Sequence, residues 1–240
     1  MAKLSTPIYV QSPGSDDEVI TFGKSGAERQ SDLENGVARF GGDWRQPSYS
    51  KAYLRAARVL VATANASGDL DQLGLPIFYL LRHATELLVK GELDMLYEIA
   101  RMRHELRPTV VNFANLPSGK AQQRLVKSHD LMPLCDDLMK ISEALGFGRY
   151  VDKRLAQLAA DLTAFESSAT WARYARPQQP SHETHTAHEV AVPLVSLQQR
   201  LERVVSSMSV DFNNQDVKTF EGETYFEWAC LMHETDAGQR

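Results

Sequence analysis

The 240-residue sequence has few cysteines and no long apolar segment. Its two cysteines, Cys135 and Cys230, lie far apart and form no C-x-x-C pair. A disulfide framework is therefore not indicated, and a reducing compartment fits best. No run of about 18 apolar residues occurs, so no membrane-spanning helix is expected. The opening stretch MAKLSTPIYVQSPGSDDE lacks the apolar region of a signal peptide. We therefore expect a cytoplasmic protein without a membrane partner.

The sequence also lacks an excess of positive charge and a nucleotide-binding glycine motif. Its formal net charge is −5 at pH 7, so a bulk electrostatic attraction to nucleic acid is not expected. A local basic patch is compatible with this total, and such a patch is sufficient for an RNA-cleaving site. The chain contains neither a Walker A segment nor a G-x-G-x-x-G segment. Nothing therefore supports a phosphate-cradling nucleotidase.

The composition is that of an ordinary globular protein, with 43% hydrophobic and 24% charged residues. We predict an N-terminal arm at 1–47, a helical domain at 48–208 and a packed C-terminal extension at 209–240. The arm is rich in Gly, Pro, Ser and Asp, which favours irregular structure. A short β-hairpin is expected where the runs Pro7–Gln11 and Glu18–Phe22 flank the turn-type cluster SPGSDD.

Apolar periodicity predicts an all-α helical bundle. The strongest helix is expected from Leu75 to Leu106, with Pro76 in its first turn and Pro108 after its end. A bend is expected near Gly91, because glycine weakens a helix interior. The other predicted helices follow Pro47 as far as Gly68 and span 120–126, 131–145, 151–165 and 189–208.

The C-terminal extension contains an aromatic cluster formed by Phe220, Tyr225, Phe226 and Trp228. So many bulky apolar groups are atypical of a disordered tail. We expect the extension to pack against the bundle or against a partner. Its residues do not decide between a strand and a helix.

A charged stripe follows one side of the strongest helix. At about 100° per residue, six side chains share one sector, while apolar residues cover most of the rest. The six are Tyr79, Arg82, His83, Glu86, Lys90 and Tyr97. One interpretation is an Arg82–Glu86–Lys90 ladder at i,i+4 spacing on an exposed strip. The other is a functional groove, because a charge on a mostly apolar helix needs a partner. In the second interpretation, Arg173 or Tyr174 lies close to Glu86.

Three segments together resemble the HEPN superfamily. They are RHATELLVK at Arg82–Lys90, SHDLMPL at Ser128–Leu134 and WARYARP at Trp171–Pro177, in this order before or on successive helices. The resemblance covers about residues 48–208. It implies a helical bundle that is generally dimeric. Many such domains are RNA-cleaving toxins or antiphage effectors, and others are non-catalytic nucleotide-binding or assembly modules.

The resemblance also implies a set of site residues. Nuclease members carry R-x4–6-H, and Arg176 and His182 have five residues between them. This match implies that both are catalytic, although two of the intervening residues are prolines and the family motif normally continues into a helix. The implied substrate-binding residues are Arg82, His83, Glu86, Lys90, His129, Arg173 and Tyr174.

Histidine and arginine are sufficient for metal-independent RNA cleavage. The reaction needs a base for the ribose 2′-OH, an acid for the leaving 5′-oxygen and a cation for the phosphorane-like transition state. Imidazole can transfer protons at neutral pH, and guanidinium binds phosphate bidentately. We therefore expect an RNA-cleaving or RNA-processing effector of a bacterial defence or toxin system. It would be a homodimer without metal or cofactor, with RNA or a nucleotide as ligand and a partner protein or antitoxin. The alternative is a non-catalytic interaction or nucleotide-binding module.

Several of these residues have simpler interpretations. His182, His185 and His188 stand at i, i+3 and i+6 and form either a metal site or a surface histidine cluster, of which the cluster is favoured. His129 is either a ligand contact or a packing residue at a helix start. Cys135 lies on an apolar helix face, where a thiol is usually inert.

Overall fold

The computed structural model of the protein describes residues 30, 34–36, 49–107, 119–165, 189–210 and 217–238. The chain divides into two compact units, Met1–Pro47 and Ser48–Arg240. In the first unit, Gln30 and Glu34 are helical, and Nε2 of Gln30 donates to Oε1 of Glu34 at 2.8 Å. The hairpin predicted within residues 7–22 lies outside the described residues.

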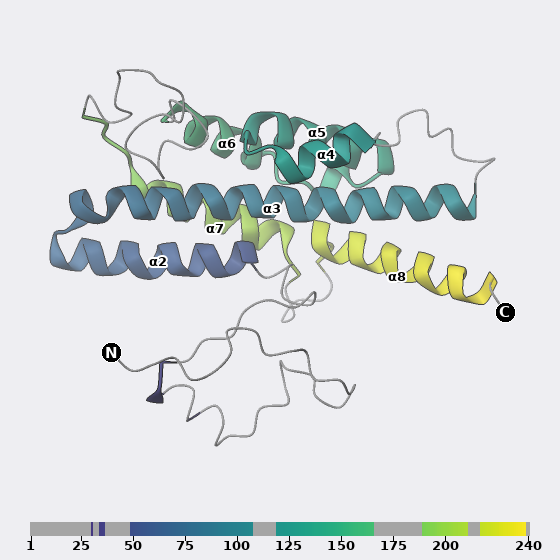
Figure 1. Cartoon of the computed structure of the whole chain (residues 1–240), viewed down its shortest axis with the longest axis horizontal. Helices are drawn as coiled ribbons and strands as arrows, with labels where there is room; N and C mark the ends of the chain where they lie inside the picture. The colour runs from purple at the N-terminus through teal and green to yellow at the C-terminus, as the bar shows by residue number, and fades with distance from the viewer. Residues whose placement is uncertain are drawn as a thin grey trace, which may run out of the picture. The chain divides into compact units, whose positions relative to one another are not determined.

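The second unit is all-α throughout its described residues, which contain no strand. This confirms the predicted fold class for that part of the chain. The hydropathy of the helices in the described ranges reveals no candidate for a membrane span. The helices, shown in Figure 1, are α2 (Tyr49–Ser67), α3 (Leu70–Leu106), α4 (Gly119–Lys127), α5 (Leu131–Leu145), the short 3-10 helix η2 (Gly148–Tyr150), α6 (Arg154–Ala164), α7 (Leu194–Met208) and α8 (Phe220–Gly238).

The α3 helix is the centre of this unit, packing against α2, α4, α5, α7 and α8. Figure 1 shows α2 and α8 along one side of α3 and α4 and α5 along the other. Helices on several sides bury apolar groups around most of its circumference, and each large group contributes roughly 1.5–3 kcal/mol. The helix continues through Gly91 without interruption. The largest fully buried side chains of α3 are Ile77, Phe78, Leu81, Leu93, Leu96 and Ile99.

The start of α3 differs from the predicted one. After α2, Gly68 has φ +77°, a left-handed conformation that glycine adopts without steric strain. Asp69 then precedes α3 directly, and the helix begins at Leu70 rather than Leu75. Pro76 therefore lies in the second turn, where its ring removes one backbone hydrogen bond. The first-turn assignment of Pro76 is wrong because the tight connection from α2 starts the helix before the proline is reached.

The α5 helix follows its predicted start and stop. The side chain of Asp130 accepts a hydrogen bond from the Met132 amide at 3.4 Å, and Gly146 ends the helix with φ +88°. The α6 helix begins at Arg154, later than the predicted Val151, because η2 occupies part of the connection from α5. Four apolar residues at helical spacing on α6 are buried: Leu155, Leu158, Ala159 and Leu162.

The α7 helix is shorter than predicted, beginning at Leu194 rather than Glu189. Pro193 is the residue before the helix rather than part of its first turn. Val195 is 37% exposed, so it points away from the core. Val195 lies outside the regular seam of α7 residues that faces the core. The buried residues of this seam are Leu194, Leu197, Gln198, Leu201, Val204 and Met208.

The C-terminal extension contains a helix, α8, that packs on the second half of α3. Phe220 and Leu231 belong to the hydrophobic core. Charged side chains add to this contact: Arg103 Nε lies 2.5 Å from Glu227 Oε1. The packing of an aromatic extension against the bundle is therefore confirmed for Phe220. Trp228 is partly buried against the core, whereas Tyr225 and Phe226 are exposed.

Candidate functional site

Glu86 is a buried carboxylate on α3, with 2% of its surface exposed. Its Oε1 accepts a hydrogen bond from Lys90 Nζ at 2.8 Å, and its Oε2 accepts from Arg82 Nη1. Arg82 is also buried, at 4% exposure. The predicted ladder of i,i+4 pairs is therefore present, but its central pair is inside the protein rather than on an exposed strip.

His129, immediately before α5, is the third partner of Glu86. Its Nδ1 lies 2.9 Å from Glu86 Oε1, and its backbone oxygen accepts from Arg82 Nη2. Two residues one turn apart on α3 thus hold both the ring and the main chain of His129. Nε2 lies on the ring edge opposite Nδ1, and the side chain is 45% exposed. The ring is therefore anchored through Nδ1, while nearly half of the side chain remains exposed.

The surroundings keep Glu86 ionised. Burial by itself raises the pKa of Glu86. The hydrogen bonds from Lys90 and His129, with the charges of Lys90 and Arg82, outweigh burial and lower this pKa to about 2. An ionised carboxylate bonded to one ring nitrogen fixes the tautomer and orientation of an imidazole, as in catalytic acid–histidine pairs. The arrangement is therefore able to position Nε2 of His129 for proton transfer.

The other predicted site residues fall into two groups. His83 contacts two tyrosine rings, with centroids 4.6 Å from Tyr53 and 5.6 Å from Tyr79. These contacts place His83 in the packing between α2 and α3. The predicted proximity of Arg173 or Tyr174 to Glu86 lies outside the described residues. The same holds for Arg176, His182, His185 and His188.

A second carboxyl group on α3, Glu92, has a different environment and was not predicted as a site residue. Lys51 Nζ on α2 lies 3.1 and 3.0 Å from the two carboxylate oxygens of Glu221 on α8. Burial raises the pKa of Glu92, Glu221 raises it further and Lys51 lowers it, giving about 8. The available signal was local: unlike Glu86, Glu92 has leucines rather than cations four residues away on either side, at Leu88 and Leu96.

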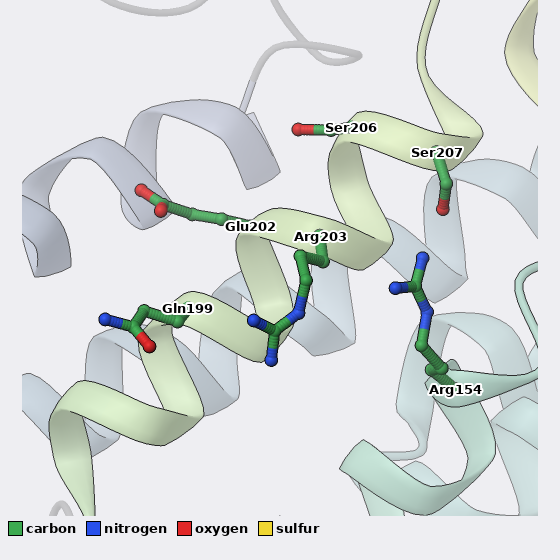
Figure 2. A pocket seen from close by; sticks show the side chains of 6 residues that line it. All are labelled: Arg154, Gln199, Glu202, Arg203, Ser206 and Ser207. Atoms are coloured by element: carbon green, nitrogen blue, oxygen red, sulfur yellow. The ribbon is translucent and has the colours of Figure 1, made fainter.

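An open hollow of about 580 Å³ lies along α7 beside the start of α6. Figure 2 shows its lining side chains, and the two arginines enter from different helices, Arg203 from α7 and Arg154 from α6. Sequence reasoning missed this feature, although four lining residues share one helical face at i, i+3, i+4 and i+7. The lining residues are Arg154, Gln199, Glu202, Arg203, Ser206 and Ser207.

The charges around this hollow are unevenly paired. Arg154 binds Asp152, with Nη2 2.5 Å from Oδ2, and Ser207 donates to the same carboxylate. Glu202 Oε1 lies 3.6 Å from Arg58 Nη1. Within the described ranges, Arg203 makes no ion pair and is exposed. Among the described residues, the hollow therefore offers one guanidinium without an ion pair, which suits an oxyanion such as a phosphate group.

No family model, curated protein or solved structure matches this chain. No group of three or more metal-binding side chains occurs in the part of the chain that the structure describes. The chemical interpretation therefore rests on the Glu86–His129 pair and on the cations around it.

Proposed function

We propose that the protein is an HEPN-like RNA-cleaving or RNA-processing effector of a bacterial defence or toxin system. The observation that supports this most directly is the hydrogen bond between Glu86 Oε1 and His129 Nδ1, at 2.9 Å. It joins an ionised, buried carboxylate to an imidazole whose side chain is 45% exposed. The proposed reaction class is transesterification of an RNA phosphodiester.

In the proposed reaction, Nε2 of His129 accepts the proton of a ribose 2′-OH. The 2′-oxygen then forms a bond to phosphorus, and the bond from phosphorus to the 5′-oxygen breaks. The leaving 5′-oxygen takes a proton from a second acid, for which we propose His182 from the R-x4–6-H motif. Arg176 from the same motif is the proposed cation for the transition-state charge. Glu86 is a positioning residue, because it acts through His129.

The hollow along α7 adds a proposed contact to the RNA backbone. Arg203 makes no ion pair among the described residues, although Glu202 lines the same hollow, and Ser206 lies on the same face of α7. A single phosphate contact of this kind makes affinity moderately salt-dependent and carries no sequence information. This matches a protein of net charge −5, for which only a local cationic contact is available.

The test is cleavage of a fluorogenic RNA by the purified full-length chain, together with growth arrest on expression. His129→Ala is expected to lower the cleavage rate by about 100-fold or more, the usual contribution of general acid–base catalysis. The double variant Arg176→Ala, His182→Ala is expected to be inactive. His104→Ala, an exposed histidine elsewhere on α3, is the matched control and retains activity. Full cleavage by His129→Ala would reject the proposed role.

The alternative function is a non-catalytic interaction or nucleotide-binding module. One observation favours it: Arg82 directs one Nη to Glu86 and the other to the backbone oxygen of His129. These bonds clamp α3 to the start of α5, which is a structural task. If this alternative holds, the wild-type chain cleaves no RNA, and His129→Ala changes only stability. Equilibrium binding of nucleotides to the wild type then becomes the informative measurement.

A further inference from the structure

Three aromatic rings of α2 and α3 are in mutual contact and are only half-buried. The ring of Tyr79 stacks on that of His83, with centroids 5.6 Å apart and an angle of 8° between the ring planes. Tyr53 of α2 meets His83 edge-on, with centroids 4.6 Å apart and an angle of 87°. Each of the three residues retains partial exposure beside these contacts. We call Tyr53, Tyr79 and His83 the Tyr79 cluster.

The Tyr79 cluster lies on the same face of α3 as the Glu86–His129 pair. Residues 79, 83 and 86 stand at i, i+4 and i+7, the spacing of one helical face. Glu86 Oε1 lies 2.9 Å from His129 Nδ1, and His83 precedes Glu86 by about one turn. At a rise of about 1.5 Å per residue, Tyr79 and Glu86 are about 10 Å apart along the helix axis. That distance is comparable with the length of a few nucleotides.

The two ends of this face have different chemistry. Leu75, four residues before Tyr79, is 40% exposed, and Pro76 beside it is also exposed. At the other end, Lys90 Nζ lies 2.8 Å from Glu86 Oε1. The first end suits a flat apolar group, and the second suits an anion.

The charges around this face have an excess of one positive charge. With histidine counted as neutral, residues 79–90 and 127–131 contain three cations and two carboxylates. The exposed Lys127 makes no ion pair among the described residues. This balance favours a ligand with phosphate groups over an acid-free apolar one. The cations are Arg82, Lys90 and Lys127, and the carboxylates are Glu86 and Asp130.

We propose that the Tyr79 cluster is a base-stacking subsite, in which one unpaired base of a single-stranded RNA lies against Tyr79 and a neighbouring phosphate approaches His129. This inference rests on the proposed function and names the part of the substrate that the subsite holds. Unpaired bases commonly stack on tyrosine and histidine rings in RNA-binding proteins. A base inside a duplex is already stacked between its neighbours, so only an unpaired base reaches such a ring.

The first test is binding of a single-stranded 2′-O-methyl oligouridine to the full-length chain, measured by fluorescence anisotropy. The 2′-oxygen of this strand cannot attack phosphorus, so no cleavage occurs. Tyr79→Leu removes the ring and is expected to weaken binding by about 10-fold, the usual contribution of one stacked base. Tyr79→Phe retains the ring and the wild-type affinity. Tyr225→Leu, the same change at an exposed tyrosine of α8, is the matched control and also retains it.

An abasic strand separates base stacking from a general loss of binding. It has the same sugar–phosphate backbone without bases, and the wild type is expected to bind it about 10-fold more weakly than oligouridine. Tyr79→Leu is expected to bind the abasic strand as well as the wild type does. A role of Tyr79 only in packing α2 against α3 would instead weaken the binding of both strands alike.

Uridine monophosphate and duplex RNA identify the source of the base. The monophosphate is expected to compete far more weakly than oligouridine, because it lacks the neighbouring phosphates. Competition at equal concentrations would assign the subsite to a free nucleotide and overturn the proposal. The duplex is expected to bind the wild type and Tyr79→Leu equally.

Three further results would overturn the proposal. They are a wild type that does not bind oligouridine, a Tyr79→Leu variant that binds it as tightly as the wild type, or a Tyr79→Phe variant that binds as weakly as Tyr79→Leu. Tyr79-dependent binding without RNA cleavage would reject the proposed cleavage and retain the subsite. Cleavage by a chain whose binding does not depend on Tyr79 would reject the subsite alone.

Discussion

Glu86 and Glu92 lie on the same helix and have opposite electrostatic environments. Glu86 faces the start of α5 and has three partners, Arg82, Lys90 and His129. Their hydrogen bonds and charges outweigh burial and lower its pKa to about 2. Glu92 interacts electrostatically with Lys51 of α2 and Glu221 of α8. Burial has the largest influence on the pKa of Glu92 and raises it to about 8.

The comparison shows that burial alone does not determine the ionisation of a carboxyl group. At Glu86, donors on the same helix and on the next element replace the lost hydration. At Glu92, the nearby Lys51 is already bonded to Glu221, so two carboxyl groups compete for one cation. The surroundings of Glu86 favour its ionised form, whereas the surroundings of Glu92 favour its neutral form.

The largest expected effect comes from Glu86→Gln. This change removes the negative charge opposite the buried Arg82 and Lys90, and it is expected to lower the free energy of unfolding by about 3 kcal/mol at pH 7. Urea unfolding measures this difference. Glu98→Gln is the control, since Glu98 is 40% exposed and pairs with Arg101 on the same helix. Its expected cost is below about 1 kcal/mol.

The same contribution has a defined pH dependence. The folded-state pKa of Glu86 lies below its ordinary value of 4.5, so the stabilisation is present above that value. It is lost as pH falls from about 4.5 toward 2. The wild type therefore loses about 3 kcal/mol over this interval that Glu86→Gln does not lose. Parallel pH profiles of the two proteins would contradict the assignment.

Glu92→Gln is expected to have an intermediate effect on the free energy of unfolding, and to raise it rather than lower it. Because the folded-state pKa of Glu92 is raised from 4.5 to about 8, wild-type stability from this group falls as pH rises between those values. Glutamine removes the cost of ionising the site. Allowing for partial solvent exposure, the variant is expected to be about 1–2 kcal/mol more stable than the wild type at pH 9.

At pH 5 the wild-type Glu92 is neutral in the folded state, so the variant is expected to differ little from the wild type. Denaturant unfolding at both pH values gives the two differences. Glu105→Gln, an exposed position on α3, serves as the control for a generic loss of one negative charge. An equal gain at pH 5 and pH 9 would show that ionisation of Glu92 is not the cause.

The smallest effect is expected at a third charged cluster on α3. Arg101 bonds to Glu98 and Glu105 with distances of 2.6 and 2.7 Å, yet its side chain is 49% exposed. These hydrogen bonds raise the pKa of Arg101 above its ordinary value. Solvent screening limits their net contribution, so Arg101→Gln is expected to cost under about 1 kcal/mol in urea unfolding. A cost comparable to that of Glu86→Gln would show that burial does not explain why the Glu86 cluster stabilises the fold more than the Arg101 cluster.

Most of the helices were predictable because their signals are local. Gly68 and Gly146 both end helices with positive φ, as their positions after apolar periodic segments indicated. The helix starts that failed were those at Leu70, Arg154 and Leu194. In each case a tight connection or a proline shifted the start, and periodicity contains little information about connections.

The candidate site was only partly predictable. The pairs of Glu86 with Arg82 and Lys90 follow from i,i+4 spacing alone. The contact with His129 spans 43 positions along the chain, so no local pattern contains it. Arg173 and Tyr174 were the predicted partners of Glu86 and lie outside the described residues. The hollow that Arg203 and Arg154 line depends equally on where α6 and α7 meet.

The sequence by itself determined the helical periodicity, the glycine stops and the charge ladder of α3, because these depend on residues within one or two turns. Only the tertiary structure decided that the ladder is buried, that Glu92 competes with Glu221 for Lys51, and that Phe226 is exposed while Phe220 is buried. Burial, the pKa of a carboxyl group and the orientation of an all-round apolar helix depend on which distant segments pack against it. Those contacts form only when the helices assemble around α3.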